Sequence, residues 1–307
     1  MLFRDKKELP GFGAPTDLPA NEALNTEWQQ ANAAWWEKHP MRYDWRDAVP
    51  FEEFSKEFYN EIDQRFFANA AEYMPYERLP FEALIPFDEL PKLDVLEIGV
   101  GNGSHAGLIA PRARSFTGID LTTYAVRSTQ ARMQQFGIKA DILQMDAEKM
   151  TFADSTFDFV WSWGVIHHSA NTRQVLVEMH RVLRPGGRAM IMVYHRSFWY
   201  YYVVAGFVYG ILLGQLFKHK SLHTVAQNMI DGALARYYTP QEWNALVSDL
   251  FRVKRTLIYG SKSDILPIPG GRIKTAILNA IPNALGRFFT NKLRMGYFLV
   301  SELTKRA

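Results

Sequence analysis

The sequence predicts an α/β protein built on a doubly wound, mostly parallel sheet of seven strands. Short apolar runs rich in strand-forming residues alternate with helical segments from residue 93 onward. The first run, Leu93–Ile98, passes into the glycine-rich turn Gly99–Gly103, and a helix is expected to begin at Ser104. A strand, a glycine turn and a helix N-terminus are typical of a nucleotide-type site, because unpaired backbone N–H groups face the ligand there.

Length and composition allow one large α/β domain or two small ones. The chain has 307 residues, of which 48% are hydrophobic, and its formal net charge is +3. This near-neutral charge does not favour nucleic acid as a partner. The absence of cysteine excludes disulfides and thiolate chemistry and fits a cytoplasmic location. The charged start Met1–Glu8 has no apolar run, so a secretory signal is not expected.

Residues 1–80 are expected to form an N-terminal arm and a helical cap. Helices are predicted over about Asn21–Lys38, which Pro40 ends, and about Phe51–Tyr73. The segment Trp35–Trp45 between them is dense in aromatic and charged residues. It is either a packing cap on the domain or part of a lid that excludes water from the site.

The βα alternation supplies the remaining elements. The further strands are expected at Ser115–Ile119, Ala140–Met145, Phe157–Ser162, Arg188–Tyr194, Arg252–Tyr259 and Gly296–Ser301. One helix is expected at Thr123–Phe136. A second is expected from the N-cap Asn171 through Val182, and Pro185–Gly187 stops it. A third is expected from the N-cap Thr239 to about Leu250.

Acidic residues stand at the ends of successive strands. Glu97 closes the first strand, Asp120 the second and Asp146 the third. The carboxyl ends of parallel strands meet at one edge of a sheet, so these side chains point into one crevice. Asp120 lies where a doubly wound sheet needs a carboxylate for a ribose hydroxyl.

Five motifs, taken together and in order, resemble those of class I S-adenosylmethionine (SAM)-dependent methyltransferases. They are Val95–Gly103, Gly118–Asp120, Met145–Ala147, Gly164–His168 and Arg181–Gly187. The branch that includes the quinone-biosynthesis methyltransferases is most similar. The resemblance covers about residues 93–195 and does not identify the acceptor. It implies a Rossmann-like fold with an antiparallel last strand, and methyl transfer from SAM to leave S-adenosylhomocysteine, with no metal expected.

The resemblance also implies the cofactor contacts. Asp120 would bind the ribose hydroxyls, and Glu97 with the amides of the glycine turn would hold the methionine end. Asp146 and the Ala147 amide would meet the adenine, although Asp146 is also a credible helix cap. The expected cofactor-binding residues are Glu97, Gly99, Gly101, Asn102, Gly103, Asp120, Leu121, Asp146, Ala147, Ser162 and Trp163.

Three histidines are candidates for proton removal, because an imidazole pKa near neutrality suits a general base. They are His167, His168 and His195. Adjacent loop residues rarely share a direction, so at most one of the first two is expected to face the acceptor.

Aromatic and charged residues near the crevice are the candidate acceptor contacts. Tyr43, Tyr194, Arg196 and Trp199 are expected to bind the acceptor. Tyr59 either contacts the methionine end of SAM, as a preceding helix often does in similar enzymes, or packs in the core.

The run Phe198–Phe217 contains twenty residues without a charge, and Gly206, Gly210 and Gly214 are spaced four apart within it. It is long enough to span a bilayer. The strands that follow must rejoin the same sheet, however, and the best second crossing, Ala276–Phe289, is short and interrupted. A transmembrane span is therefore not expected.

Three interpretations of this run remain open. It is a buried or homodimer-forming helix, a helix that enters one membrane leaflet, or a wall of an acceptor pocket. Lys218 and Lys220 follow it and would contact anionic headgroups in a peripheral membrane association. The last two interpretations both imply a hydrophobic acceptor.

The sequence therefore predicts a SAM-dependent methyltransferase acting on O or C of a hydrophobic small molecule or lipid-like acceptor. A SAM-binding assembly protein without catalysis is one alternative. A nicotinamide-dependent oxidoreductase is disfavoured, because Ser104 follows the three glycines instead of the longer spacing that presents pyrophosphate. The expected parts are the cap at 1–80, a SAM-binding core at 81–197, an apolar helical insertion at 198–238, and residues 239–307, which complete the sheet.

Overall fold

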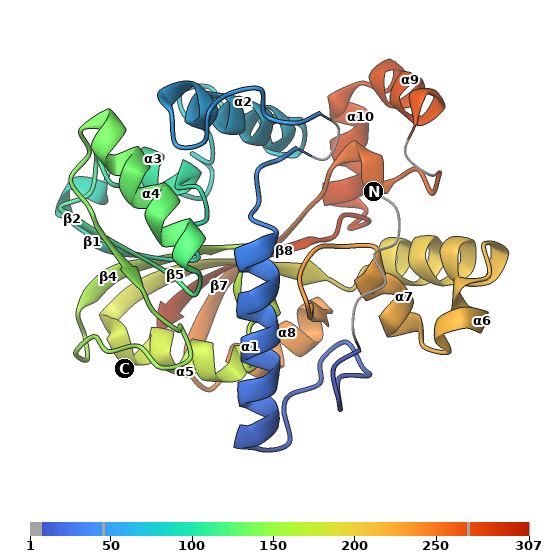
Figure 1. The fold of residues 1–307 in the computed structure, drawn as a ribbon, viewed down its shortest axis with the longest axis horizontal. Coiled ribbons are helices and arrows are strands. Elements are labelled where there is room, and N and C mark those ends of the chain that lie inside the picture. Colours follow the sequence, from blue (N-terminus) through green and yellow to red (C-terminus); the bar gives the residue numbers. More distant parts are fainter. Residues whose placement is uncertain (1–7, 45–46, 269–270, 307) are drawn as a thin grey trace.

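The computed structural model of the chain describes residues 8–44, 47–268 and 271–306 (Figure 1). The sequence interpretations of the first seven residues and of Trp45 lie outside this part. A sheet in the order β3-β2-β1-β4-β5-β8-β7 forms the middle layer, and β6 pairs with β5. The strands are β1 Asp94–Ile98, β2 Ser115–Asp120, β3 Asp141–Gln144, β4 Phe157–Trp163, β5 Leu183–His195, β6 Tyr237–Tyr238, β7 Phe251–Tyr259 and β8 Phe298–Lys305.

The predicted fold class is confirmed. Strands β1 to β6 pair in parallel, whereas β8 lies antiparallel between β5 and β7. The sheet of the described residues has eight strands where seven were expected, because the short pair Tyr237–Tyr238 was not recognised as a strand. The expected helix stop at Pro185–Gly187 instead lies inside β5, since the preceding helix already ends at Val182.

Helices cover the sheet and one of its ends. They are α1 Glu22–Lys38, α2 Lys56–Tyr73, α3 Ser104–Ile109, α4 Thr123–Phe136, α5 Thr172–Val182, the π-helix η3 Phe198–Leu212, α6 Gln215–His219, α7 Leu222–Asn228, α8 Pro240–Val247, α9 Arg272–Ala280, α10 Asn283–Arg287 and the π-helix η5 Phe288–Lys292. The predicted N-caps Asn171 and Thr239 are confirmed: each side chain accepts a hydrogen bond from a first-turn N–H, and Thr239 forms a capping box with Glu242.

Two hydrophobic cores lie on opposite faces of the sheet. Val95 and Leu96 are neighbours in β1, and because strand side chains alternate they belong to different cores. The core containing Val95 includes buried residues of α2, α3 and α4. The core containing Leu96 includes buried residues of α5 and α8. The sheet is therefore covered on both faces, which leaves its strand ends for a binding site.

Helix α1 lies against the loops at the carboxyl ends of the strands (Figure 1). The Gln29 amide donates to Asp146 Oδ1 at 2.8 Å and accepts from the Ala170 N–H at 3.0 Å. The Asn25 amide donates to Glu148 Oε2 at 2.9 Å. Side chains of the N-terminal helix thus hold the loops that follow β3 and β4.

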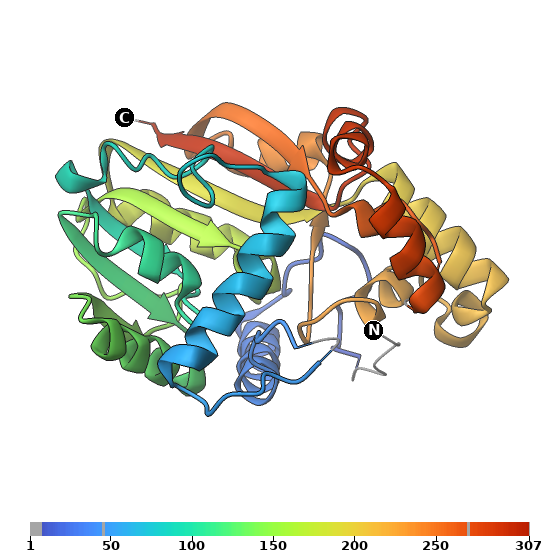
Figure 2. The same ribbon diagram turned by 90° about the horizontal axis from the view of Figure 1, so that it is seen from above.

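The helices η3, α6 and α7 gather at the same end of the sheet as α9 and α10 in two perpendicular views (Figures 1 and 2). The apolar run of the sequence makes up η3 and α6. No helix within the described ranges is both long and apolar enough to cross a membrane.

The glycine turn after β1 brings the loops of β1, β2 and β4 together. The Gly99 N–H donates to the Ile119 carbonyl at 2.7 Å, and its φ is +81°. A Cβ added at Gly99 would lie 2.2 Å from Val165 Cγ2. Gly101 also has a positive φ, +54°, but a Cβ there would meet nothing within 4 Å. The first glycine is thus required by packing, whereas the second borders open space.

We expect Gly99→Ala to lower the free energy of unfolding by about 1–3 kcal/mol more than Gly101→Ala. Both variants carry the cost of a side chain at positive φ, so the excess reports the contact with Val165. Chemical denaturation measures it. Adding Val165→Ala to Gly99→Ala should recover part of the loss, and no recovery would contradict this contact as the cause.

Candidate active site

One large cavity of about 1190 Å³ opens at the carboxyl ends of the strands. The loops after β1, β2, β3 and β4 line one part of it, and η3, α9 and the segment after β7 line the other. A pocket for a single drug-sized ligand has roughly 300–1,000 Å³. This cavity therefore has room for a cofactor and a second molecule.

The structure brings most of the predicted cofactor residues to this cavity. Those that line it are Gly99, Gly101, Asn102, Asp120, Leu121, Ala147 and Trp163. Glu97, Gly103, Asp146 and Ser162 are not among the lining residues.

Asp120 is held rigidly at the cavity by the chain around it. Its Oδ1 accepts hydrogen bonds from the Thr122 N–H at 3.0 Å and the Thr122 hydroxyl at 2.9 Å, and its Oδ2 accepts from the Gly101 N–H at 3.2 Å. Burial raises the pKa of this carboxyl, and these hydrogen bonds oppose the rise. The carboxylate thus links the glycine turn to the end of β2.

Glu97 is buried, with 2% of its surface exposed, and its Oε2 has no hydrogen-bond partner in the described part of the chain. Its Oε1 lies 3.9 Å from Nδ1 of His105, which does line the cavity. Burial raises the pKa of Glu97 well above its usual range and lowers the pKa of His105 to about 3. An unpaired acid beneath the glycine turn is costly without a partner, which fits a ligand cation such as the ammonium of SAM.

Of the other three predicted cofactor residues, Asp146 and Gly103 have structural roles. Asp146 Oδ1 accepts from the Glu148 N–H at 2.9 Å and from Gln29. Asp146 thus caps the turn after β3, which is close to the capping role that the sequence suggests as the alternative. A Cβ on Gly103 would meet Thr129 and Arg132 at 3.0 Å, so this glycine allows α4 to pack closely. Ser162 is buried, and its hydroxyl has no partner among the described residues.

Two of the four predicted acceptor contacts, Tyr43 and Tyr194, line the cavity, whereas Arg196 and Trp199 do not. Arg196 pairs with Glu242 of α8. The indole N–H of Trp199 donates to the Ile265 carbonyl at 3.1 Å. Both side chains therefore tie η3 and the end of β5 to neighbouring segments.

Only one of the three candidate histidines, His168, lines the cavity. Its Nδ1 lies 2.7 Å from the Leu234 carbonyl, so Nδ1 carries the proton and Nε2 is the basic atom of the neutral ring. His167 is fully buried against Tyr194, with ring centroids 3.9 Å apart, and burial lowers its pKa well below the usual value. His195 donates from Nδ1 to the Gly296 carbonyl at 2.8 Å, and burial lowers its pKa to about 4.

Tyr59 is fully buried, and its hydroxyl donates to the Ser128 carbonyl at 2.6 Å. It is not among the residues that line the cavity. This geometry favours the core-packing interpretation of Tyr59.

Residues of the insertion and of the segment after β7 complete the cavity. Tyr200, Val204, Tyr209 and Leu213 project from one face of η3, four to five residues apart. The i→i+5 hydrogen bonding of a π-helix brings residues at this spacing to one side. This spacing is already present in the sequence of the apolar run Phe198–Phe217. Nothing in the sequence singled out Asp264, Lys274 and Tyr297, which line the same region.

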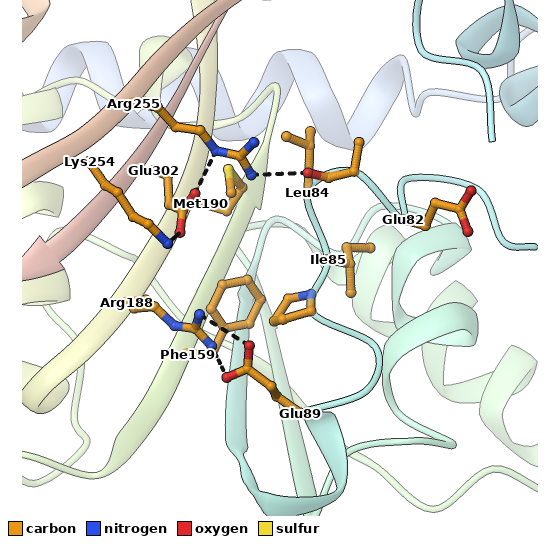
Figure 3. Close-up of a pocket in the computed structure, with 12 residues that line it drawn as sticks. Glu82, Leu84, Ile85, Glu89, Phe159, Arg188, Met190, Lys254, Arg255 and Glu302 are labelled. Atoms are coloured by element: carbon orange, nitrogen blue, oxygen red, sulfur yellow. Dashed lines mark hydrogen bonds and ion pairs between the residues drawn. The ribbon is translucent and has the colours of Figure 1, made fainter. Parts of the chain in front are cut away.

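A second, smaller cavity of about 400 Å³ lies at the loop Glu82–Glu89, beside β5 and β8 (Figure 3). Most of its charged groups pair with one another. Glu302 accepts from Lys254 at 2.9 Å and from Arg255 at 2.6 Å, and Arg188 pairs with Glu89 at 2.7 Å. The large cavity is therefore the candidate active site.

Comparison with known proteins agrees with the fold and the glycine turn. Residues 96–191 match the family model of a methyltransferase domain. A ubiquinone biosynthesis O-methyltransferase of Rickettsia prowazekii is 24% identical over 66% of this chain and 76% of its own length. A ubiquinone/menaquinone biosynthesis C-methyltransferase of Desulfotalea psychrophila is 30% identical over 52% of this chain and 63% of its own length.

A solved structure shows the same fold. In a complex between the Haloferax volcanii Trm112 methyltransferase activator and a methyltransferase, one chain matches with a TM-score of 0.51 at 16% identity, covering 80% of this chain and 94% of that one. The chain carries a methyltransferase domain at residues 96–191, and its sheet order and glycine turn are those of the class I SAM-dependent methyltransferase fold. It is an enzyme of methyl transfer that uses SAM.

The residues present fit this cofactor. The cavity contains the open position at Gly101 and the fixed carboxylate of Asp120. The described residues contain no group of three or more acidic or histidine side chains that could hold a metal ion.

We expect Asp120→Ala to weaken S-adenosylhomocysteine binding by roughly ten- to over a hundredfold. A hydrogen bond to a charged group contributes about 1.5–3 kcal/mol, and each 1.4 kcal/mol is tenfold. Calorimetry measures the affinity. Asp141→Ala, an exposed acid at the start of β3, is the matched control and should bind as the wild type does. Unchanged affinity in folded Asp120→Ala would contradict the cofactor position.

Proposed function

We propose that this enzyme transfers the methyl group of SAM to O or C of a hydrophobic small molecule or lipid-like acceptor. The observation that carries the proposal is a single cavity with two different ends. One end holds the glycine turn and Asp120, and the other is lined mainly by apolar and tyrosine side chains of η3 and the C-terminal segments, together with Asp264 and Lys274. Two relatives are named as methyltransferases of quinone biosynthesis, one acting on O and one on C.

Methyl transfer from SAM requires the protein mainly to bind and orient the reactants. The sulfonium of SAM, when bound, supplies an activated methyl group, so a strong catalyst is not required. Asp120 would hold the ribose, and the amides after Gly99 with Glu97 would hold the methionine end. Trp163 lies at the carboxyl end of β4 and lines the cavity. In this proposal α1 and η3, which contribute Trp36 and Tyr200 to the wall, would exclude water.

The parts of the chain take matching roles in this proposal. Residues 81–197 would bind the cofactor, the cap at 1–80 and the insertion at 198–238 would enclose the acceptor, and residues 239–307 would complete the sheet. The described arm of the cap contacts the insertion, with the rings of Phe12 and His223 4.9 Å apart between centroids.

The proposal is tested by turnover. Purified protein is incubated with isotope-labelled SAM and a lipid extract of the source cells, and labelled products are identified by mass spectrometry. Label in a hydrophobic compound, with release of S-adenosylhomocysteine, is the expected result. Label only in water-soluble compounds would contradict the hydrophobic acceptor. Binding of SAM without any turnover would favour a non-catalytic SAM-binding protein.

If the methylated atom is a hydroxyl oxygen, His168→Gln should lower turnover by roughly 10²–10⁴ while SAM binding stays near normal. The reason is that His168 lines the cavity and keeps Nε2 as its basic atom. Steady-state kinetics with the acceptor identified above measures the effect. His195→Gln is the control, because its ring does not line the cavity. Full activity in His168→Gln would refute this base.

We also propose that the helical end of the molecule rests on a membrane surface. Phe198 and Phe217 are each 76% exposed and Ile273 is 75% exposed. Other exposed apolar residues at this end are Tyr202, Phe207, Ile211, Leu212, Leu213, Ile268, Ile277, Leu285, Phe288 and Leu293. Lys218 and Lys220 follow η3 and would meet anionic headgroups. A hydrophobic acceptor could then pass from the bilayer into the cavity.

We expect the protein to float with anionic liposomes and to be released by an alkaline carbonate wash. The double variant Phe207→Glu/Phe217→Glu should lose flotation, because exposed apolar side chains supply the binding energy. Leu18→Glu/Leu143→Glu, two exposed apolar residues on other elements, should float normally. If the first variant still floats, this surface does not bind the membrane. The wild type could instead be a dimer that does not bind liposomes. If the variant is then a monomer, the surface serves self-association.

A further inference from the structure

The acid Asp264 lines the apolar end of the cavity and is not used by the mechanism above. It ends the short 3₁₀ turn Lys262–Asp264, which follows β7. Only 8% of its surface is exposed. Its Oδ2 has no hydrogen-bond partner among the described residues, although the cavity contains tyrosine and lysine side chains.

The local structure does not account for this acid. Its carboxyl accepts hydrogen bonds from the Ser263 hydroxyl, which lies 3.4 Å from Oδ1, and from the Ser261 backbone, and its own N–H donates to the Ser261 carbonyl at 2.9 Å. The Lys274 ammonium donates to the Leu266 carbonyl at 3.0 Å. A buried carboxyl that leaves one oxygen unpaired is destabilising, so a fold alone gives no reason for it.

Aromatic rings stand beside this carboxyl. Tyr200 of η3 and Tyr297 stack with ring centroids 5.1 Å apart at an interplanar angle of 20°, and both line the cavity. The charge of Asp264 contributes to raising the pKa of both hydroxyls, after burial, so the acid lies near both rings. Flat apolar surfaces and one unpaired acceptor oxygen suit an aromatic ring that carries a hydroxyl.

We propose that Asp264 is the acceptor-recognition residue: its carboxyl accepts a hydrogen bond from a hydroxyl group of an aromatic acceptor that packs against Tyr200 and Tyr297. This inference rests on the proposed function and specifies its substrate class as hydroxylated aromatic compounds. The acceptor's hydroxyl supplies the partner that the acid lacks.

The interaction should depend on pH. Burial raises the pKa of Asp264 to about 8, and the nearby Lys274 opposes this rise. A carboxylate accepts a stronger hydrogen bond than a carboxylic acid, so the preference for a hydroxyl should increase as pH rises from 7 to 9. The other titratable groups that face the acid are Glu72 and Tyr73 of α2, Tyr200 and Tyr297. The three tyrosines have raised pKa values, so they stay protonated in this interval.

The test uses a matched pair of probes, 4-octylphenol and its methyl ether 4-octylanisole, which differ only at the hydroxyl. Protein saturated with S-adenosylhomocysteine is titrated with each probe by tryptophan fluorescence or calorimetry. We expect the wild type to bind the phenol about tenfold more tightly than the ether. Asp264→Ala should bind both equally, and Asp264→Asn should keep a reduced, pH-independent preference. Asp88→Ala, an exposed acid, should behave as the wild type does.

Each outcome decides one question. Equal binding of the two probes by the wild type, no binding of either probe, or a full preference in Asp264→Ala would overturn the inference. S-adenosylhomocysteine affinity is measured in the same samples and should be unchanged in every variant. Failure of the wild type to bind S-adenosylhomocysteine would instead reject the proposed function itself.

Discussion

The close approach at the glycine turn is the contact on which the rest of the site depends. Gly99 packs against Val165, so the chain leaving β1 touches the chain leaving β4, and its N–H bonds the end of β2. A side chain at that position would separate the loops. Because they meet, the fixed carboxylate of Asp120 faces the same cavity as the open position at Gly101. The cofactor end of the site is thus built from the backbone geometry of a parallel sheet.

The proposed acceptor end has a different origin. After β5 the chain leaves the sheet, forms η3, α6 and α7, and returns through β7 and β8. The apolar run was ambiguous in the sequence because it is long enough to span a bilayer. In the structure one face of η3 lines the cavity while Phe198, Phe207 and Ile211 face outward. One helix therefore serves both as a wall of the pocket and as an exposed apolar surface.

The sequence predicted the fold well, because apolar strands, glycine turns and capping residues are local signals. The antiparallel β8, the N-caps Asn171 and Thr239 and the glycine turn all lie where they were expected. The short β6 was missed, because a two-residue strand carries no periodicity. Pairing with β5 alone makes it a strand.

The sequence predicted only part of the candidate site, because the burial and direction of a side chain depend on residues far apart in the chain. The sequence could not show that His167 points into the core while its neighbour His168 lines the cavity. It could not show that Arg196 pairs with Glu242 across the fold. Asp264 was overlooked for the same reason, since its surroundings come from α9, η3 and the loop before β8, far apart in the chain.

The central claim is that one cavity holds SAM at the glycine turn and the acceptor beside η3. A crystal structure of the protein with S-adenosylhomocysteine tests it most directly. We expect the ribose hydroxyls on Asp120, the homocysteine over Gly99–Gly101, and unfilled space between the sulfur and Tyr200. Ligand bound away from Asp120, or a ligand that fills the cavity as far as η3, would contradict it.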